Sequence, residues 1–382
     1  MPPAAQLSLW LTLARLPGLP GRIPHGLLER FGGIAALFDA PQDEIETAIA
    51  AAAAEAGRSV DVRKAAHAFA AGPRAAECAR DLAWLAEPTH HLVTWLDPDY
   101  PPLLREIVDP PLVLYVHGRP DVLARPQLAI VGSRNPTPVG RQNAVAFARA
   151  LCDAGLAITS GLALGIDAAA HRAALEAGGT TIAVAGTGLD RVYPPSNREL
   201  ARAIAERGAL VSEFPVGTPA RPAHFPIRNR LISGLSLGVL VVEAAEHSGS
   251  LITARLAAEQ GREVFALPGS IHSPLARGCH LLIRQGAKLV ETAAHVLEEL
   301  GPLAAVSANA RLPASAPDEA LAPNERAVLD NLGYEPTSVD ALIERSGLTP
   351  DTVSSILLQL ELRGLVLVGP GGYQRAPRDG GR

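Results

Sequence analysis

The segment His224-Phe225-Pro226-Ile227-Arg228-Asn229-Arg230 places two arginines and an asparagine beside a phenylalanine. A guanidinium can make paired hydrogen bonds with a phosphate, and an exposed aromatic ring can stack on an unpaired base. If the segment is helical, Arg228 and Arg230 face different sides, so that one can reach a ligand and the other can pair with Glu243 or Glu213. These residue types predict a binding site for a polyanion. Alternatively, Phe225 is a core residue of its loop.

A second group of candidates lies in glycine-containing turns that follow apolar strands. Gly132-Ser133-Arg134 could offer turn amides, a hydroxyl and a guanidinium to a phosphate. A plain strand-to-helix turn explains this tripeptide equally well, and the G-x-G-x-x-G spacing of dinucleotide-binding proteins is absent. Weaker candidates of the same kind are Gly161, Gly188 and Ser250. In the turn of Ser250, helix capping by Ser248 or Ser250 is the alternative.

Asp167 and His171 are four residues apart on an expected helix and therefore share a face. A catalytic or metal-binding pair is conceivable. The simpler interpretation is that Asp167 stabilises the first turn of the helix and His171 packs in the core. No third ligand is evident, so we expect no metal site.

From residue 128 onward, apolar strands alternate with helices. The strands are expected near residues 128–131, 156–159, 181–185, 209–212, 239–242, 263–267 and 287–290. Nearly continuous apolar strands of this kind indicate a parallel sheet covered on both faces. In such sheets a ligand binds beyond the carboxyl ends of the strands, where the candidate glycine turns also lie. The fold class is therefore α/β, with an extended Rossmann-like sheet.

The flanking regions differ in character. Residues 1–75 predict a helical domain, in which the turn around Gly18 and Gly21 is typical either of a helix-hairpin-helix unit or of an ordinary helical bundle. Residues 76–300 form the sheet domain, with a proline-limited connecting segment over 76–127 that holds one strand at 112–116. Residues 301–322 are rich in Ala, Pro and Ser and predict a linker, and residues 323–375 predict a winged helix.

Composition limits the possible functions. The chain has 382 residues, a formal net charge of -5 and 48% hydrophobic residues, so any contact with nucleic acid must come from a local patch. Cys78, Cys152 and Cys279 form no CxxC pair, and we expect neither disulfides nor a zinc site. A signal peptide and a membrane-spanning segment are not evident, so a cytoplasmic protein is expected.

The motifs, in this order, resemble the DNA processing protein A family (DprA, also called Smf). They are Gly132-Ser133-Arg134, Ser160-Gly161 with Asp167 and His171, Gly188-Leu189-Asp190 with Tyr193-Pro194, Phe225-Pro226 with Arg228-Asn229-Arg230, and Val241–Ala244 with Ser248-Gly249-Ser250. Longer members also carry an N-terminal helical domain of the SAM type and a C-terminal winged helix.

The resemblance implies a single-stranded DNA-binding protein that protects incoming DNA and loads the RecA recombinase during natural transformation. It further implies a homodimer, no enzymatic turnover and no cofactor. By motif match, Arg134 holds phosphate and the segment 225–230 lines the same pocket. Some members of the family carry basic residues near the positions of Pro195 and Ile227, and these positions are apolar in this chain. We therefore expect Arg191, Arg198 or Arg221 to supply the positive charge around the pocket, its basic rim.

Two other classes of function were weighed. A nucleotide-cleaving enzyme of the lysine-decarboxylase-like Rossmann group would need a Pro-Gly-Gly-x-Gly-Thr motif, whereas Ser248-Gly249-Ser250 stands at the equivalent turn. A winged-helix transcription factor would need a basic third helix, but the expected third helix carries Asp351 and Glu361 against Arg363. We expect this winged helix to contact a protein or to bind DNA weakly.

Overall fold

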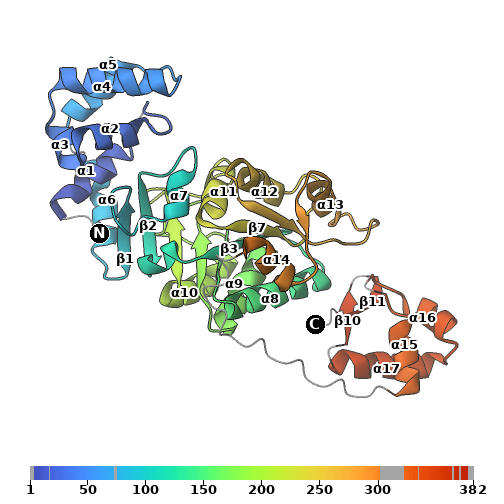
Figure 1. The fold of residues 1–382 in the computed structure, drawn as a ribbon. Coiled ribbons are helices and arrows are strands. Elements are labelled where there is room, and N and C mark those ends of the chain that lie inside the picture. The colour runs from blue at the N-terminus through green and yellow to red at the C-terminus, as the bar shows by residue number, and fades with distance from the viewer. Residues whose placement is uncertain are drawn as a thin grey trace.

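The computed structural model describes residues 4–16, 18–72, 75–301, 322–333, 335–363, 365–369 and 371–376. The chain opens with six helices, followed by a large sheet with its covering helices and a small C-terminal unit (Figure 1). The N-terminal helices are α1 (Ala4–Leu13), α2 (Ile23–Phe31), α3 (Ile34–Asp39), α4 (Gln42–Glu55), α5 (Val62–Ala70) and α6 (Ala75–Leu85).

The N-terminal helices are fastened to the sheet by polar contacts as well as by a shared core. Arg15 pairs with Asp81 on α6, and the second carboxylate oxygen of Asp81 accepts a hydrogen bond from the amide of Val216 (3.1 Å). Arg22 follows the turn that contains Gly18 and Gly21, and it donates to the carbonyl of Ile107 (2.8 Å). This guanidinium therefore serves the junction between the helical unit and the sheet.

The sheet has nine strands in the order β1-β2-β6-β5-β4-β3-β7-β8-β9. The strands from β6 to β9 in this order are parallel, whereas β1 and β2 join one edge in antiparallel fashion. Their bounds are β1 (His90–Thr94), β2 (Val113–Gly118), β3 (Gln127–Val131), β4 (Ala157–Ser160), β5 (Thr181–Val184), β6 (Ala209–Ser212), β7 (Gly238–Val241), β8 (Glu263–Ala266) and β9 (Lys288–Leu289).

The predicted parallel sheet is confirmed, but the expected connecting segment contains more regular structure than its prolines suggested. Besides the predicted strand, residues 76–127 contain most of α6, the strand β1 and the short helix α7 (Pro102–Glu106). The run His90–Thr94 begins with two histidines and is short, so its apolar pattern is weak. It becomes a strand because it pairs with β2 along its whole length.

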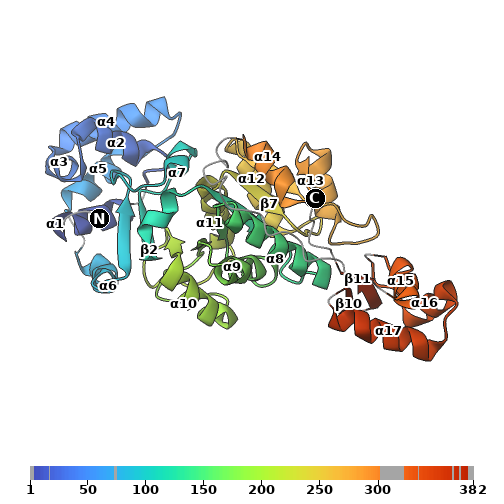
Figure 2. The ribbon, with the colours of Figure 1, turned by 60° about the horizontal axis from the view of Figure 1, so that its bottom comes forward.

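Helices cover both faces of the sheet, as Figures 1 and 2 show: α8, α9 and α10 lie on one face, and α11, α12 and α13 on the other. The sheet separates two apolar cores, one on each face, and alternate residues of β3 belong to different cores. Ile130 packs toward α8 and α9, while Val131 belongs to the core beneath α11 and α12. The helix bounds are α8 (Pro138–Asp153), α9 (Ile166–Glu176), α10 (Arg198–Arg207), α11 (His224–Leu235), α12 (Gly249–Glu259), α13 (Arg277–Arg284) and α14 (Ala293–Leu300).

The chain order creates a switch point in the sheet. After β3 the chain builds outward through β4, β5 and β6, and then returns to place β7 on the other side of β3. Loops that leave the carboxyl ends of β3 and β7 therefore run in opposite directions and leave a crevice between them. This topology places the predicted glycine turns at a common edge.

The C-terminal unit is a winged helix with its own apolar core around Val328, Leu342 and Leu360. It consists of α15 (Pro323–Asp330), α16 (Val339–Ser346), α17 (Pro350–Leu362), β10 (Val366–Gly369) and β11 (Gly372–Arg375). The predicted linker lies almost wholly outside the described residues, which resume at 322. Within the described parts of the chain, no helix combines the length and the apolar character needed to cross a membrane.

Candidate functional site

The carboxyl ends of β3, β4 and β5 meet the first turns of α11, and Phe225 lies at the centre of this meeting point. The Arg134 and Arg228 guanidinium carbons lie 5.9 and 6.0 Å from the centre of the Phe225 ring. The ring also lies over Gly186, where an added Cβ would be 3.2 Å from a ring carbon. The structure therefore brings together three of the residues singled out from the sequence, which come from positions far apart in the chain.

Arg228 forms the floor of this site rather than its surface. Its side chain is 5% exposed, and Nη1 donates to the carbonyl oxygen of Val184 at the end of β5 (3.1 Å). The guanidinium passes directly over Gly161, because a Cβ at that position would lie 1.7 Å from Nη1. Gly161 is thus needed to seat Arg228, and a role of Gly161 toward DNA stays a prediction.

Charge at the floor is only partly balanced. Burial lowers the pKa of Arg228 to about 10; the nearby charge of Arg134 acts in the same direction, and Asp167 opposes both. Burial raises the pKa of Asp167, while its carboxylate accepts hydrogen bonds from the amides of Gly161 (3.1 Å) and Ala163 (3.3 Å). The charges of Arg228 and Arg134 thus act on each other, with Asp167 as the one carboxylate opposing them, and this excess of positive charge favours an anion.

Asp167 and His171 share a face of α9, but their side chains have separate hydrogen-bond partners, as the simpler interpretation of the sequence expects. His171 is fully buried and its Nδ1 lies 2.6 Å from the hydroxyl of Thr181, away from the Asp167 carboxylate bonds. Burial lowers the pKa of His171 to about 3, so the ring is neutral. Over the described ranges no group of His, Cys, Asp and Glu side chains could hold a metal ion.

In the turn Gly132-Ser133-Arg134, both backbone groups of Ser133 are used inside the protein. The amide of Ser133 donates to the carbonyl of Glu243 on the far side of the switch point (2.7 Å), and its carbonyl accepts from the amide of Ile166 (3.1 Å). Gly132 fits between Ile166 and Glu243, where a Cβ would come within 2.8 Å of the Ile166 side chain. The Ser133 amide is therefore not free for a phosphate, whereas the Arg134 side chain of the same turn is exposed.

The other predicted residues of α11 support the fold. Arg230 pairs with Glu213 at the end of β6, one of the two partners expected from the sequence, and its Nε lies 3.8 Å from Asp109. Glu243 instead accepts a hydrogen bond from the amide of Thr137 (2.9 Å). The Asn229 side chain donates to the carbonyl of Gly249 (3.4 Å). Neither Arg230 nor Asn229 reaches the Phe225 ring in this arrangement.

Gly188 and Ser250 lie outside the cluster around Phe225. The amide of Gly188 donates to the carbonyl of Thr218 (3.0 Å), within the packed loop after β5. Ser250 lies in the first turn of α12, its hydroxyl 2.8 Å from that of Ser248, which caps this helix. The structure therefore contains the alternative given for this turn, in which a serine caps the helix. A role of these residues toward DNA stays a prediction.

Tyr193, to which the sequence assigns no role of its own, also lies at the site. The ring of Tyr193 lies 5.5 Å from that of Phe225, tilted by 41°, and Tyr193 is 48% exposed. The one feature of the sequence that could have pointed to Tyr193 is its position in the loop after a predicted strand. Of the three arginines expected to extend the basic rim, Arg191 pairs with Asp190 (2.7 Å), whereas Arg198 begins α10 and Arg221 is exposed before α11.

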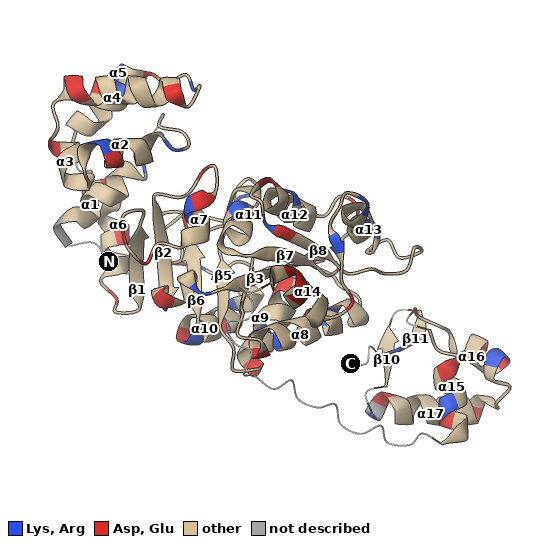
Figure 3. Cartoon of the chain, in the orientation of Figure 1, with Lys and Arg blue, Asp and Glu red and all other residues tan. Residues whose placement is uncertain are grey.

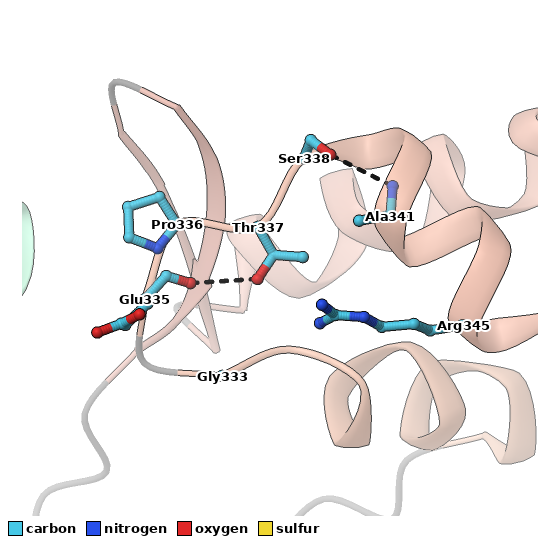
Figure 4. A pocket seen from close by; sticks show the side chains of 7 residues that line it. All are labelled: Gly333, Glu335, Pro336, Thr337, Ser338, Ala341 and Arg345. Carbon is cyan, nitrogen blue, oxygen red and sulfur yellow. Dashed lines mark hydrogen bonds between the residues drawn. The ribbon is translucent and has the colours of Figure 1, made fainter. Parts of the chain in front are cut away.

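Away from this site, the described residues show interspersed charges and two further hollows. Lys and Arg are interspersed with Asp and Glu over the helices (Figure 3). A cavity of about 410 Å³ lies in the winged helix (Figure 4), where Arg345 points toward Thr337. There the hydroxyl of Ser338 accepts a hydrogen bond from the amide of Ala341 (3.3 Å) and so caps α16. A second hollow of about 300 Å³ lies between α9 and α10, and neither contains a residue predicted from the sequence to bind DNA.

Comparisons with known proteins agree with this architecture. The profile described as DNA recombination-mediator protein A matches residues 91–301, and that of the DprA winged helix domain matches residues 312–372. Protein Smf of Escherichia coli is 46% identical over 305 residues, which cover 78% of this chain and 80% of that protein. The DNA processing protein DprA of Bacillus subtilis is 48% identical over 202 residues, which cover 53% of this chain and 68% of that protein.

Solved structures show the same relationship. The X-ray structure of DprA from Streptococcus pneumoniae has a TM-score of 0.66 at 37% identity, covering 76% of this chain and 97% of that one. DprA from Helicobacter pylori, described for its single-stranded DNA binding mode, has a TM-score of 0.50 at 32% identity, covering 55% of this chain and 95% of that one. The chain therefore belongs to the DNA recombination-mediator protein A family, known as DprA or Smf.

Proposed function

We propose that this protein binds single-stranded DNA at the site around Phe225. The observation that carries the proposal is the exposed Arg134 guanidinium 5.9 Å from the centre of the Phe225 ring, with the buried charge of Arg228 beneath the same ring. Arg134 neutralises a phosphate, and the ring contacts a base. An aromatic surface of this kind favours a single strand, because the bases of a duplex are stacked on one another and do not offer their faces.

The residues of the site divide into contacts and supports. Arg134 and Phe225 contact the strand, and Arg198 and Arg221 extend the basic rim. Arg228 holds a positive charge below the surface and ties α11 to β5 through the Val184 carbonyl. The ion pair between Arg230 and Glu213 ties α11 to the end of β6.

The wider role follows from the family. The relative from Helicobacter pylori is described for binding single-stranded DNA, and the matching profile is that of a recombination mediator. We infer that this protein is a binding protein rather than an enzyme, that it protects incoming strands during natural transformation, and that it delivers them to a RecA-type recombinase. A homodimer would place two sites on one strand and raise avidity without new contacts.

Replacement of Arg134 tests the assignment of the site. In Arg134→Ala, binding of a labelled oligo-dT should weaken at low salt, and the slope of log affinity against log salt should become shallower by about 0.7, the value for one lost phosphate contact on a single strand. Fluorescence anisotropy over a series of salt concentrations measures both quantities.

A matched control is Arg149→Ala. Arg149 lies in the last turns of α8, which lead away from the carboxyl edge of the sheet, and it pairs with Glu176 (2.8 Å). This control should retain the affinity and salt slope of the parent. Equal affinity and equal slope for Arg134→Ala and the parent would remove Arg134 from the site.

A further inference from the structure

Three large apolar side chains are exposed on segments that contribute to the site or adjoin it. Tyr193 is 48% exposed, and Leu164 and Ile227 are each 43% exposed. They come from three separate segments: the loop after β4, the loop after β5 and the first turn of α11. Exposed apolar groups that gather at one place indicate a contact surface rather than incidental exposure.

Contacts between the loops bring the segments that carry Leu164 and Tyr193 to the edge of the sheet where Arg134 lies, and Ile227 follows Phe225 by two residues. Leu164 precedes Gly165, which approaches the Arg134 carbonyl so closely that a Cβ there would lie 2.6 Å from it. The side chain of Asn197, just beyond Tyr193, donates to the carbonyl of Leu162 in the same loop (2.9 Å). The loop after β4 is thus tied to the Arg134 turn at one end and to the Tyr193 loop at the other.

The aromatic residues form two pairs on either side of the β5 end. Tyr193 and Phe225 are one pair, with ring centres 5.5 Å apart. His224 and Phe214 are the other, with ring centres 4.4 Å apart and planes 21° apart, and His224 Nδ1 lies 3.2 Å from the Gly186 carbonyl. Since the rings within each pair are already in contact, a base cannot insert between them and must lie on an outer face.

We propose that Tyr193 stacks on a base of single-stranded DNA and extends Phe225 to a platform of two rings, with Leu164 and Ile227 packing against the edges of the same bases. This inference rests on the proposed function and names a second residue of that site. The occupant is an unpaired base because the neighbouring Arg134 supplies the charge that a phosphate of the same strand requires. Stacking of this kind tolerates any base, because every base offers a flat face.

The apolar rim has a consequence for the balance of forces. Where Pro195 and Ile227 stand, the chain offers no charge to a phosphate, and the exposed Tyr193 and Ile227 offer apolar surface instead. Compared with a site that has basic residues at these two positions, a larger share of the affinity for DNA should therefore come from contacts with bases, which do not release counterions. Loss of Tyr193 should weaken binding without changing its dependence on salt.

The test compares Tyr193→Ala with Tyr193→Phe in the full chain, using anisotropy of labelled oligo-dT over a series of salt concentrations. Tyr193→Ala should bind about tenfold more weakly than the parent, with the parent's salt slope. Tyr193→Phe keeps the ring and should bind as the parent does. Val108→Ala, which alters an apolar side chain that is 79% exposed on the segment after α7, is the control and should bind as the parent does.

An abasic oligonucleotide of equal length separates stacking from other effects. The parent and Tyr193→Ala should bind it equally, because it offers a backbone without bases. If Tyr193→Ala binds oligo-dT as tightly as a parent whose binding is salt-sensitive, the role of Tyr193 is overturned while the proposed function stands. Equal weakness of Tyr193→Phe and Tyr193→Ala would also overturn stacking. A parent that binds no single strand sinks both proposals.

Discussion

At the scale of single residues, identical side chains in one segment have different uses. Arg228 binds the carbonyl of Val184 and Arg230 pairs with Glu213, so both point into the protein. The helical period predicted that they face different sides, and of the two partners offered from the sequence, Glu243 and Glu213, the structure contains the pair with Glu213. It could not predict that Arg228 is buried, because its seat is made by Gly161 and by a strand end more than forty residues away in the chain.

Burial of His171 predicts a specific dependence of stability on pH. Its pKa is about 3 in the folded protein and about 6.5 when unfolded, so the unfolded state binds the extra proton as the pH falls below about 6.5. The stability that neutral His171 contributes is therefore present above pH 6.5 and is lost as the pH falls toward 3. Between pH 7 and pH 5 this loss amounts to about 2 kcal/mol.

A comparison with His171→Asn isolates this residue from buried carboxyls such as Asp167, whose raised pKa acts in the opposite direction. The parent should lose about 2 kcal/mol more than His171→Asn between pH 7 and pH 5, measured by urea unfolding. The exposed His272 provides a control, and His272→Asn should follow the parent. Parallel losses in the parent and in His171→Asn would contradict a neutral, buried ring.

At the scale of elements, the carboxyl ends of the strands determine where the site lies and which residues reach it. Apolar runs predicted the seven strands β3 to β9 because parallel strands covered on both faces need continuous apolar sequence. The strand β1 was missed because its pairing with β2, rather than its own pattern, makes it a strand. The glycine turns were predicted at the right edge, but Gly132 and Gly161 serve close packing inside the protein, which the sequence cannot distinguish from approach to a ligand.

Gly161 gives a prediction at this scale. In Gly161→Ala the added methyl group would occupy the position of the Arg228 guanidinium, so Arg228 must leave its place beneath Phe225. We expect a loss of about 1–3 kcal/mol in the free energy of unfolding, and weaker binding of oligo-dT by the folded fraction. Urea unfolding and anisotropy measure the two effects.

Gly26→Ala is the matched control, because Gly26 lies within α2 and an added Cβ meets nothing within 4 Å. Alanine is the better helix former, so this variant should be at least as stable as the parent. If Gly161→Ala were as stable as Gly26→Ala and bound DNA as the parent does, the seat of Arg228 would not matter to the site.

At the scale of the whole molecule, the net charge of -5 and the interspersed acidic and basic residues in Figure 3 mean that overall electrostatics do not attract DNA. Binding must come from the local excess of positive charge around Arg134 and Arg228 and from the rings beside them. The sequence predicted the arrangement of a parallel sheet with a winged helix after it. It did not predict which rings come together, because Tyr193 and Phe225 meet only when two loops fold over the end of β5.

The most direct test of the central claim is the anisotropy of labelled oligo-dT bound to the full chain, challenged with an excess of unlabelled duplex at several salt concentrations. The account predicts saturable binding that weakens as salt rises and that duplex barely displaces, because a duplex offers phosphates but not the faces of its bases. Absence of binding, or displacement by duplex as effective as by unlabelled single strand, would contradict it.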